Sequence, residues 1–152
     1  GYADFTSVQD AIDAAEAAGA GVNTPYLVMV RPGLYTENLD FKPFVHVFGA
    51  EGNPSGTANQ RAVVLRGAHS VTTSVNSDLV VLGRLTLENI TSNTNSTLVK
   101  NGLGSVSLYR CDLEQQGLGA SQGPAFRLNR GVAFLDYCTL AAHPSLADDR
   151  SA

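Results

Sequence analysis

The residue best suited to chemistry in this 152-residue chain is Glu37, in the segment VRPGLYTEN at residues 30–38. A hydrophobic run leads into a Pro32-Gly33 turn, and the segment ends in a carboxylate followed by the amide of Asn38. A glutamate at such a place can serve as a general acid or base. It can equally accept backbone N–H groups and fix the turn, and the tight Pro-Gly geometry favours this role. We therefore expect Glu37 to be architectural.

The other acids and histidines do not form a catalytic set. Asp112 and Asp136 alternate with residues that we expect to face inward, so both should point to solvent. Their separation of 24 residues (136 − 112) does not match the repeat described below, so they should not stack. His46 is expected at the surface or in a groove, and His69 and His143 in turns. No Ser-His-Asp nucleophile elbow is present, and we predict no catalytic, cofactor-binding or metal-binding residue.

Two cysteines, Cys111 and Cys138, are too few and too far apart in sequence for a disulfide framework. No histidine or further cysteine lies at ligand spacing around either one. We expect buried free thiols, with a disulfide or a metal site as the alternatives. The triplets at 89–91 and 95–97 match glycosylation sequons, although Asn89 is equally suited to a bend of the chain.

Composition limits the class of protein. A hydrophobic content of 43% with only 16% charged residues suits one folded domain with a substantial core. The net charge is −4 and no basic cluster is present, which argues against nucleic-acid binding. The longest apolar runs are too short to span a membrane, so no membrane partner is expected. No signal-peptide pattern opens the chain, and its first residue, Gly1, suggests a processed chain or an excised fragment.

The beginning of the chain predicts a helix from about Ser7 to Ala18. Ser7 can cap its N-terminus, with Asp10 at the third helical position. One face collects four apolar side chains, against which Phe5 can pack from outside the cap: Val8, Ala11, Ile12 and Ala15. Beyond Pro25, short segments rich in Val and Leu alternate with Gly, Asn, Ser and Pro, which is typical of strands and turns.

The last three of these segments repeat. Leu85 to Cys111 is 26 residues (111 − 85), and Cys111 to Cys138 is 27 (138 − 111). The other matched columns are Val80/Val106/Ala133, Leu82/Leu108/Leu135 and Leu87/Leu113/Leu140. Such a period is the length of one coil of a parallel β-helix, in which matched residues stack. We predict an all-β, right-handed, single-stranded parallel β-helix of about five coils at residues 25–140. The capping helix and its connection occupy 1–24, and a polar tail occupies 141–152.

Three segments resemble the pectinesterase-like members of the pectin-lyase-like superfamily. They are the opening with its G-x-Y-x-E turn (Gly33, Tyr35, Glu37), the strand LTLENIT at 85–91, and LYRCDLEQQGLG at 108–119. The resemblance implies a β-helix with a capping helix, and an architectural G-x-Y-x-E turn in which Tyr35 covers the coil.

The esterase chemistry of that family does not carry over. The resemblance implies two catalytic Asp residues, one after each Cys-containing coil, oxyanion-stabilising Gln side chains, and an Arg on a later coil. Here the corresponding stretches are Glu-Gln-Gln-Gly at 114–117 and Leu-Ala-Ala-His-Pro at 140–144, and Arg150 does not lie in the motif. We expect no enzymatic activity. If the protein is an enzyme, it should be a carbohydrate esterase, lyase or glycoside hydrolase.

The resemblance and the composition together favour a non-enzymatic structural protein of a virion, either a capsid decoration (cement) protein or a tail spike or fibre component. Expected partners are copies of the same chain, most simply in a homotrimer, and other virion structural proteins, in a virion or extracellular location. No second capping helix is evident at the C-terminal end, so a partner should cover it. The alternative is a polysaccharide-binding or polysaccharide-degrading β-helix. Stacking aromatics are few: Tyr26, Tyr35, Tyr109 and Tyr137.

Overall fold

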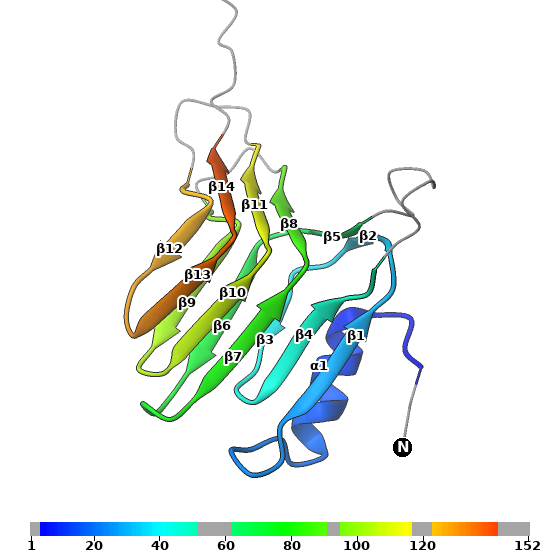
Figure 1. The fold of residues 1–152 in the computed structure, drawn as a ribbon, viewed down its shortest axis with the longest axis vertical. Helices are drawn as coiled ribbons and strands as arrows, with labels where there is room; N and C mark the ends of the chain where they lie inside the picture. Colours follow the sequence, from blue (N-terminus) through cyan, green and yellow to red (C-terminus); the bar gives the residue numbers. More distant parts are fainter. Residues whose placement is uncertain (1–3, 52–61, 91–94, 117–122, 143–152) are drawn as a thin grey trace, which may run out of the picture.

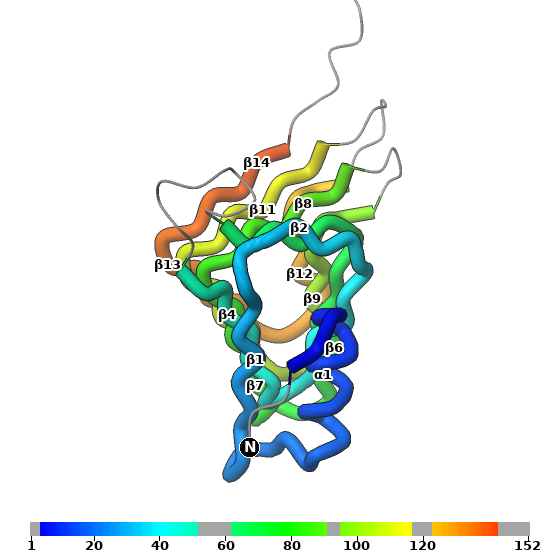
Figure 2. Tube along the Cα trace, turned by 90° about the vertical axis from the view of Figure 1, so that its right-hand side faces the viewer, coloured from blue at the N-terminus to red at the C-terminus, as the bar shows by residue number. Residues whose placement is uncertain are grey.

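The computed structural model describes residues 4–51, 62–90, 95–116 and 123–142, which form one stack of parallel β-coils preceded by a short helix. The strands lie one beyond the next along the stack in the order of the chain (Figure 1). Figure 2 views the stack from its N-terminal end, where the coils superpose around a common interior. The predicted all-β parallel solenoid with an N-terminal helix is confirmed.

Three parallel sheets form the walls of the solenoid, and the helix is α1 (Val8–Ala17). The first sheet contains, in spatial order, β1 (Tyr26–Val30), β4 (Val45–Gly49), β7 (Leu79–Gly83), β10 (Ser105–Tyr109) and β13 (Val132–Asp136). The second sheet contains β2 (Gly33–Thr36), β5 (Val63–Arg66), β8 (Thr86–Asn89), β11 (Asp112–Gln115) and β14 (Thr139–Ala142). The third sheet contains β3 (Asp40–Phe41), β6 (His69–Thr73), β9 (Leu98–Gly102) and β12 (Phe126–Leu128).

The number of coils differs from the prediction of about five. The first and second sheets hold five strands each but the third holds four, so the last coil consists of β13 and β14 in the described part of the chain. The coils from β4 to β12 lie between two other coils, although β12 itself is the edge strand of the third sheet. The solenoid therefore has about three enclosed turns rather than five, with one end coil at each extremity.

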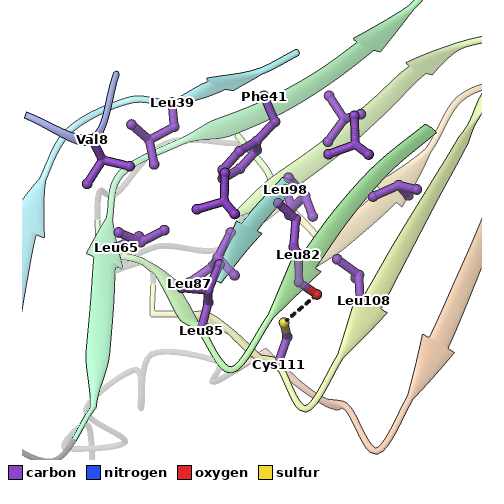
Figure 3. Packing of buried hydrophobic residues seen from close by; sticks show 14 of the residues in the cluster. Val8, Leu39, Phe41, Leu65, Leu82, Leu85, Leu87, Leu98, Leu108 and Cys111 are labelled. Atoms are coloured by element: carbon purple, nitrogen blue, oxygen red, sulfur yellow. Dashed lines mark hydrogen bonds between the residues drawn. The ribbon is translucent and has the colours of Figure 1, made fainter. Parts of the chain in front are cut away.

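The apolar columns predicted from the repeat are present. Leu108 pairs with Leu82 on one side and Leu135 on the other, and Leu113 pairs likewise with Leu87 and Leu140. The inner residues of the central coils are fully buried, as Figure 3 shows around Leu82, Leu85, Leu87 and Leu108. Alternating strand residues thus send one set of side chains into a shared core.

A single residue makes the corner between the first and second sheets in three successive coils. Arg84, Arg110 and Tyr137 have positive φ angles of 56°, 50° and 51°. The left-handed conformation turns the chain within one residue, at a cost of roughly 1–3 kcal/mol for a residue other than glycine. The backbone N–H of Arg84 then bonds the Tyr109 carbonyl, and that of Arg110 bonds the Asp136 carbonyl. Each corner is thereby fastened to the next.

The helix α1 covers the N-terminal end of the core. Ser7 has extended backbone angles and its side chain accepts the N–H of Asp10, which is the predicted cap. Val8, Ile12 and Ala15 are buried against the first coil, and Val8 lies near Leu39 in Figure 3. The expected packing of Phe5 is weak, because that side chain remains 47% exposed.

Candidate functional site

Glu37 lies at the end of β2 and fastens α1 to the first coil. Its Oε1 accepts the N–H of Val8 at 3.1 Å, and its Oε2 accepts the N–H of Gln9 and the hydroxyl of Ser7, both at 3.0 Å. The carboxylate therefore occupies the positive end of the helix dipole and satisfies two of its free donors. The predicted architectural role has a specific form: Glu37 is a helix cap supplied from 30 residues away.

A side-chain amide continues this closure along β3. Gln9 Oε1 accepts the N–H of Asp40 at 2.9 Å, and Gln9 Nε2 donates to the Asp40 carbonyl at 3.4 Å. One amide group thus supplies the donor and the acceptor that a neighbouring strand would supply. Tyr35 packs against the core and its hydroxyl donates to the Arg31 carbonyl, so it covers the coil as expected.

His69 is not in a turn, and that prediction is wrong. It is the first residue of β6, only 2% exposed, and it joins the first two coils. Its Nδ1 accepts the N–H of Leu39 at 3.2 Å, and its Nε2 lies 3.1 Å from the Leu65 carbonyl, to which the neutral ring donates. Burial lowers the pKa of His69 to about 4, so the ring is neutral at physiological pH.

His46 lies on the outer face of β4, as predicted for a surface histidine. Its Nδ1 accepts the N–H of Val81 at 3.2 Å, which ties β4 to β7. Burial lowers the pKa of this ring as well. The two described histidines are therefore both engaged with backbone groups, and His143 lies outside the described residues.

A polar cluster fills the interior where the second sheet ends. Asn89 and Gln115 are fully buried and pair with each other in register. Thr97 donates to the Glu114 carbonyl at 2.7 Å and lies 3.0 Å from Gln115 Oε1. Asn89 Nδ2 donates to the Asn95 carbonyl. The burial of Asn89 favours a structural bend residue, the second of the two readings of that sequon.

Lys100 is a buried charge that the sequence reasoning missed. Its Nζ donates to the Thr73 hydroxyl and the Asn101 carbonyl at 2.8 Å, and to the Gly102 carbonyl at 3.0 Å. Burial lowers the pKa of this ammonium, while the Asp78 carboxylate opposes that shift. The signal was available in LVKNG, because period-2 alternation places Lys100 on the same inward face as Leu98.

The two aspartates near the cysteines face outward and do not converge. Asp112 and Asp136 are both exposed and occupy different registers, Asp112 beside Thr86 and Thr139, and Asp136 beside Tyr109. The prediction that they do not stack is confirmed. Glu88 is nearly buried on the outer face of β8, where Arg66 Nε donates to its Oε1 at 2.6 Å.

The thiols are free, as predicted. Cys111 is buried and its Sγ lies 3.5 Å from the Leu82 carbonyl (Figure 3), whereas Cys138 in the last coil is half-buried. Burial raises the pKa of Cys111 to about 11, so it is almost fully protonated at neutral pH. Such a thiol is a small hydrophobic residue in a column rather than a nucleophile.

The described part of the chain contains neither a metal-ligand cluster nor a membrane-spanning helix. No three His, Cys, Asp or Glu side chains there lie together in a way that would hold a metal ion. No helix within the described ranges is long and apolar enough to cross a membrane.

Large apolar side chains are exposed together in two places among the described residues. One is the outer face of β1 and β4, where Leu27 is 60% and Met29 56% exposed, and where the Phe48 ring packs over Gly83. The other is the C-terminal end of the stack, where β12 and the last coil expose large apolar side chains on and between their strands: Leu128, Val132, Phe134, Leu135, Tyr137 and Leu140. These surfaces, rather than a reactive cluster, are the candidate functional features.

The polar side chains inside the solenoid thus hold its coils together, and its exposed surface includes two apolar areas. Comparisons of the chain with protein-family models, with curated proteins and with solved structures give no match.

Proposed function

We propose that this protein is a non-enzymatic structural β-solenoid that acts as a subunit of a larger assembly. The observation that carries the proposal is the use of its chemically capable side chains. Glu37 caps a helix, His69 bridges two coils, and Lys100 binds hydroxyl and carbonyl groups in the interior. A catalytic group must reach a substrate, whereas these three are engaged with the protein itself.

A virion is the assembly that we favour. The G-x-Y-x-E turn and the capping helix support it through their resemblance to the pectin-lyase-like superfamily, from which phages build spikes and other virion proteins. The low charged content of 16% suits a subunit whose surface is largely contact area. In such a particle the protein would serve as a decoration protein or as part of a tail spike or fibre.

The outer face of the first sheet supports assembly into a trimer. Leu27 and Met29 are more than half exposed there, and Phe48 and Val81 continue the apolar surface on the next two strands. A side wall of a solenoid can pack around a three-fold axis parallel to the stack, which buries the same face of every subunit. We expect Leu27→Asp to convert this trimer to smaller species in light scattering, whereas Thr86→Asp on the second sheet should not.

Activity measurements and imaging test the proposal. The purified chain should release no methanol, reducing ends or unsaturated products from a panel of charged and neutral polysaccharides, and it should not be retained by them. Electron microscopy of the native particle should show ordered copies in contact with neighbouring proteins. Polysaccharide cleavage that is abolished by Asp112→Asn or Asp136→Asn would overturn the proposal in favour of an enzyme. Retention without cleavage would favour a carbohydrate-binding module.

A further inference from the structure

Among the described residues, nothing covers the interior side of the last coil. Leu135 and Leu140 occupy the inward columns that are fully buried at Leu108 and Leu113 one coil earlier, yet they are 41% and 47% exposed. Leu128, which follows the inward column of Lys100 in β12, is 46% exposed. The end face is therefore apolar and consists of core residues that have no next coil in the described part of the chain.

The backbone of β13 has hydrogen-bonding groups directed away from the stack. The N–H of Val132 bonds the Gly104 carbonyl, and the carbonyl of Asp136 accepts the N–H of Arg110, so these two residues face β10. Backbone groups alternate in direction along a strand, so those of Ala133 and Leu135 point to the free side. Because β13 is the last strand of the first sheet in the described part of the chain, no described residue pairs with these four groups, and another chain can do so.

We propose that this end face binds the end face of a second copy of the chain, through antiparallel pairing of the two β13 strands about a two-fold axis at Phe134. Ala133 of each copy then lies opposite Leu135 of the other, and each such pair exchanges two backbone hydrogen bonds. The N-terminal end cannot be the partner surface, because α1 covers it and Gln9 already satisfies Asp40. Head-to-tail stacking is thereby blocked, and a closed pair results.

The alternation of inward and outward side chains along β13 is compatible with a two-fold axis that passes beside a residue, here Phe134, rather than between two residues. About Phe134, inward Ala133 meets inward Leu135, and outward Val132 meets outward Asp136. An axis between two residues would instead place inward side chains opposite outward ones. Inward side chains of one copy therefore continue into inward side chains of the other, and the two hydrophobic cores become one.

The stepped shape of the end is also self-complementary. Among the described residues, the third sheet ends at β12 and the second sheet ends one coil later at β14, so the described end of the stack is stepped. The two-fold axis through β13 exchanges the other two walls and sets β14 of one copy against β12 of the other. The protruding β14 of each copy then lies next to the recessed β12 of its partner. Leu140 of one copy and Leu128 of the other are buried in the shared interior.

The charges near β13 favour the antiparallel arrangement. Arg130 precedes the strand and Asp136 ends it, and both are exposed without an ion-pair partner among the described residues. In the antiparallel pair, the Arg130 end of each strand lies beside the Asp136 end of the other. This gives two symmetric cation–anion contacts, whereas a parallel arrangement would place like charges together.

Covalent capture tests the axis. Residue 134 would face itself in a non-hydrogen-bonded antiparallel pair, where Cα atoms are about 4.5 Å apart, a distance that a disulfide can span. Mild oxidation of Phe134→Cys should therefore give a covalent dimer of twice the 15.9 kDa chain mass. Ser107→Cys, on the same outward row one coil earlier, is the matched control. Both cysteine variants are made in a Leu27→Asp background, which removes the trimer contact of the first sheet, and Ser107→Cys should then stay monomeric on a denaturing gel. Native Cys138 is too far from the axis to cross-link the wild type.

Sedimentation equilibrium with charge variants tests the pairing. The measurements use a Leu27→Asp background, so that an association through the first sheet does not obscure the end contact. Arg130→Glu and Asp136→Arg should each weaken the dimer roughly tenfold, and the double variant should restore most of the affinity. A Leu27→Asp chain that remains monomeric at high micromolar concentration, or a Ser107→Cys chain that cross-links as readily as Phe134→Cys, would overturn the proposal. Failure here leaves the structural role of the first sheet untouched.

Discussion

The two ends of this solenoid solve the same problem differently. Both end coils have strands that lack a neighbour on one side, and both begin with the same kind of apolar interior. At the N-terminal end α1 covers the core, Glu37 caps the helix, and Gln9 replaces a strand along β3. At the C-terminal end, no described residue covers the core or replaces a neighbouring strand. The comparison teaches that the repeat makes the coils, but that closing them requires residues outside the repeat.

The largest expected effect compares two leucines of one column. Leu108→Ala, inside the stack, should reduce the free energy of unfolding by about 2–5 kcal/mol, because it leaves a cavity. Leu135→Ala, one coil later and 41% exposed, should cost less than about 1 kcal/mol in dilute monomeric protein. Urea unfolding monitored by circular dichroism gives both values. Equal losses would show that the last coil is covered.

The second effect is a dependence of the free energy of unfolding on pH, which originates at His69 between the first two coils. Burial lowers the pKa of His69 to about 4, whereas the unfolded side chain titrates near 6.5. The unfolded state therefore binds more protons at acid pH. The stability that neutral His69 provides is complete above pH 6.5 and is lost as the pH falls towards 4. We expect a loss of roughly 1.5–2 kcal/mol between pH 6.5 and 5.

Denaturant titrations at half-unit pH steps would measure this slope. His46→Gln should keep most of it, since that ring lies on the outer face of β4 and is only partly buried. A folded His69→Gln variant should show a flatter profile. An unchanged slope in that variant would assign the effect to other groups.

The third effect concerns the closure itself. Glu37→Gln keeps the shape of the side chain but removes the charge that interacts with the N-terminus of α1. We expect a loss of roughly 1–3 kcal/mol, because charge-assisted bonds to two backbone N–H groups are weakened. Glu51→Gln, which removes an exposed ion pair with Arg84, is the control and should change stability by less than about 0.5 kcal/mol. Helical signal lost before strand signal on heating would support a local role for Glu37.

The smallest effect is chemical rather than thermodynamic. Cys138 at the open end should react with iodoacetamide at least about tenfold faster than Cys111, which is buried and has a pKa of about 11. Peptide mass spectrometry after timed labelling of dilute protein would separate the two sites. Similar rates would mean that the central coil opens as easily as the last one.

The periodic parts of the fold could be predicted from sequence, and the closing contacts could not. Columns such as Leu82, Leu108 and Leu135 follow from a 26–27-residue repeat and from alternation along strands. The third sheet was missed, because its strands are short or send polar residues inward, as His69 and Lys100 do. Without that sheet, the coils could not be counted correctly.

The site residues show the same limit. Glu37 was assigned to the architecture from its turn, but its partner on α1 lies 29 residues earlier in the chain, and no local pattern shows such a contact. His69 was placed in a turn, whereas β6 begins at that residue and its side chain is buried in the interior of the solenoid. Polar side chains that satisfy buried backbone groups need the three-dimensional register before they can be identified.

The one-residue corners at Arg84, Arg110 and Tyr137 recur at equivalent places in the last three coils, which makes those coils equivalent to one another. They fix the length of chain between the first and second sheets, so that a residue in one of these coils has an equivalent residue one coil later. A tandem duplication of residues 80–105 would therefore rejoin the chain at equivalent places and add one complete coil in register. Each such duplication would lengthen the rod by about 4.8 Å, the spacing of neighbouring strands. Repeated duplication of this one gene segment would therefore lengthen the solenoid in equal increments.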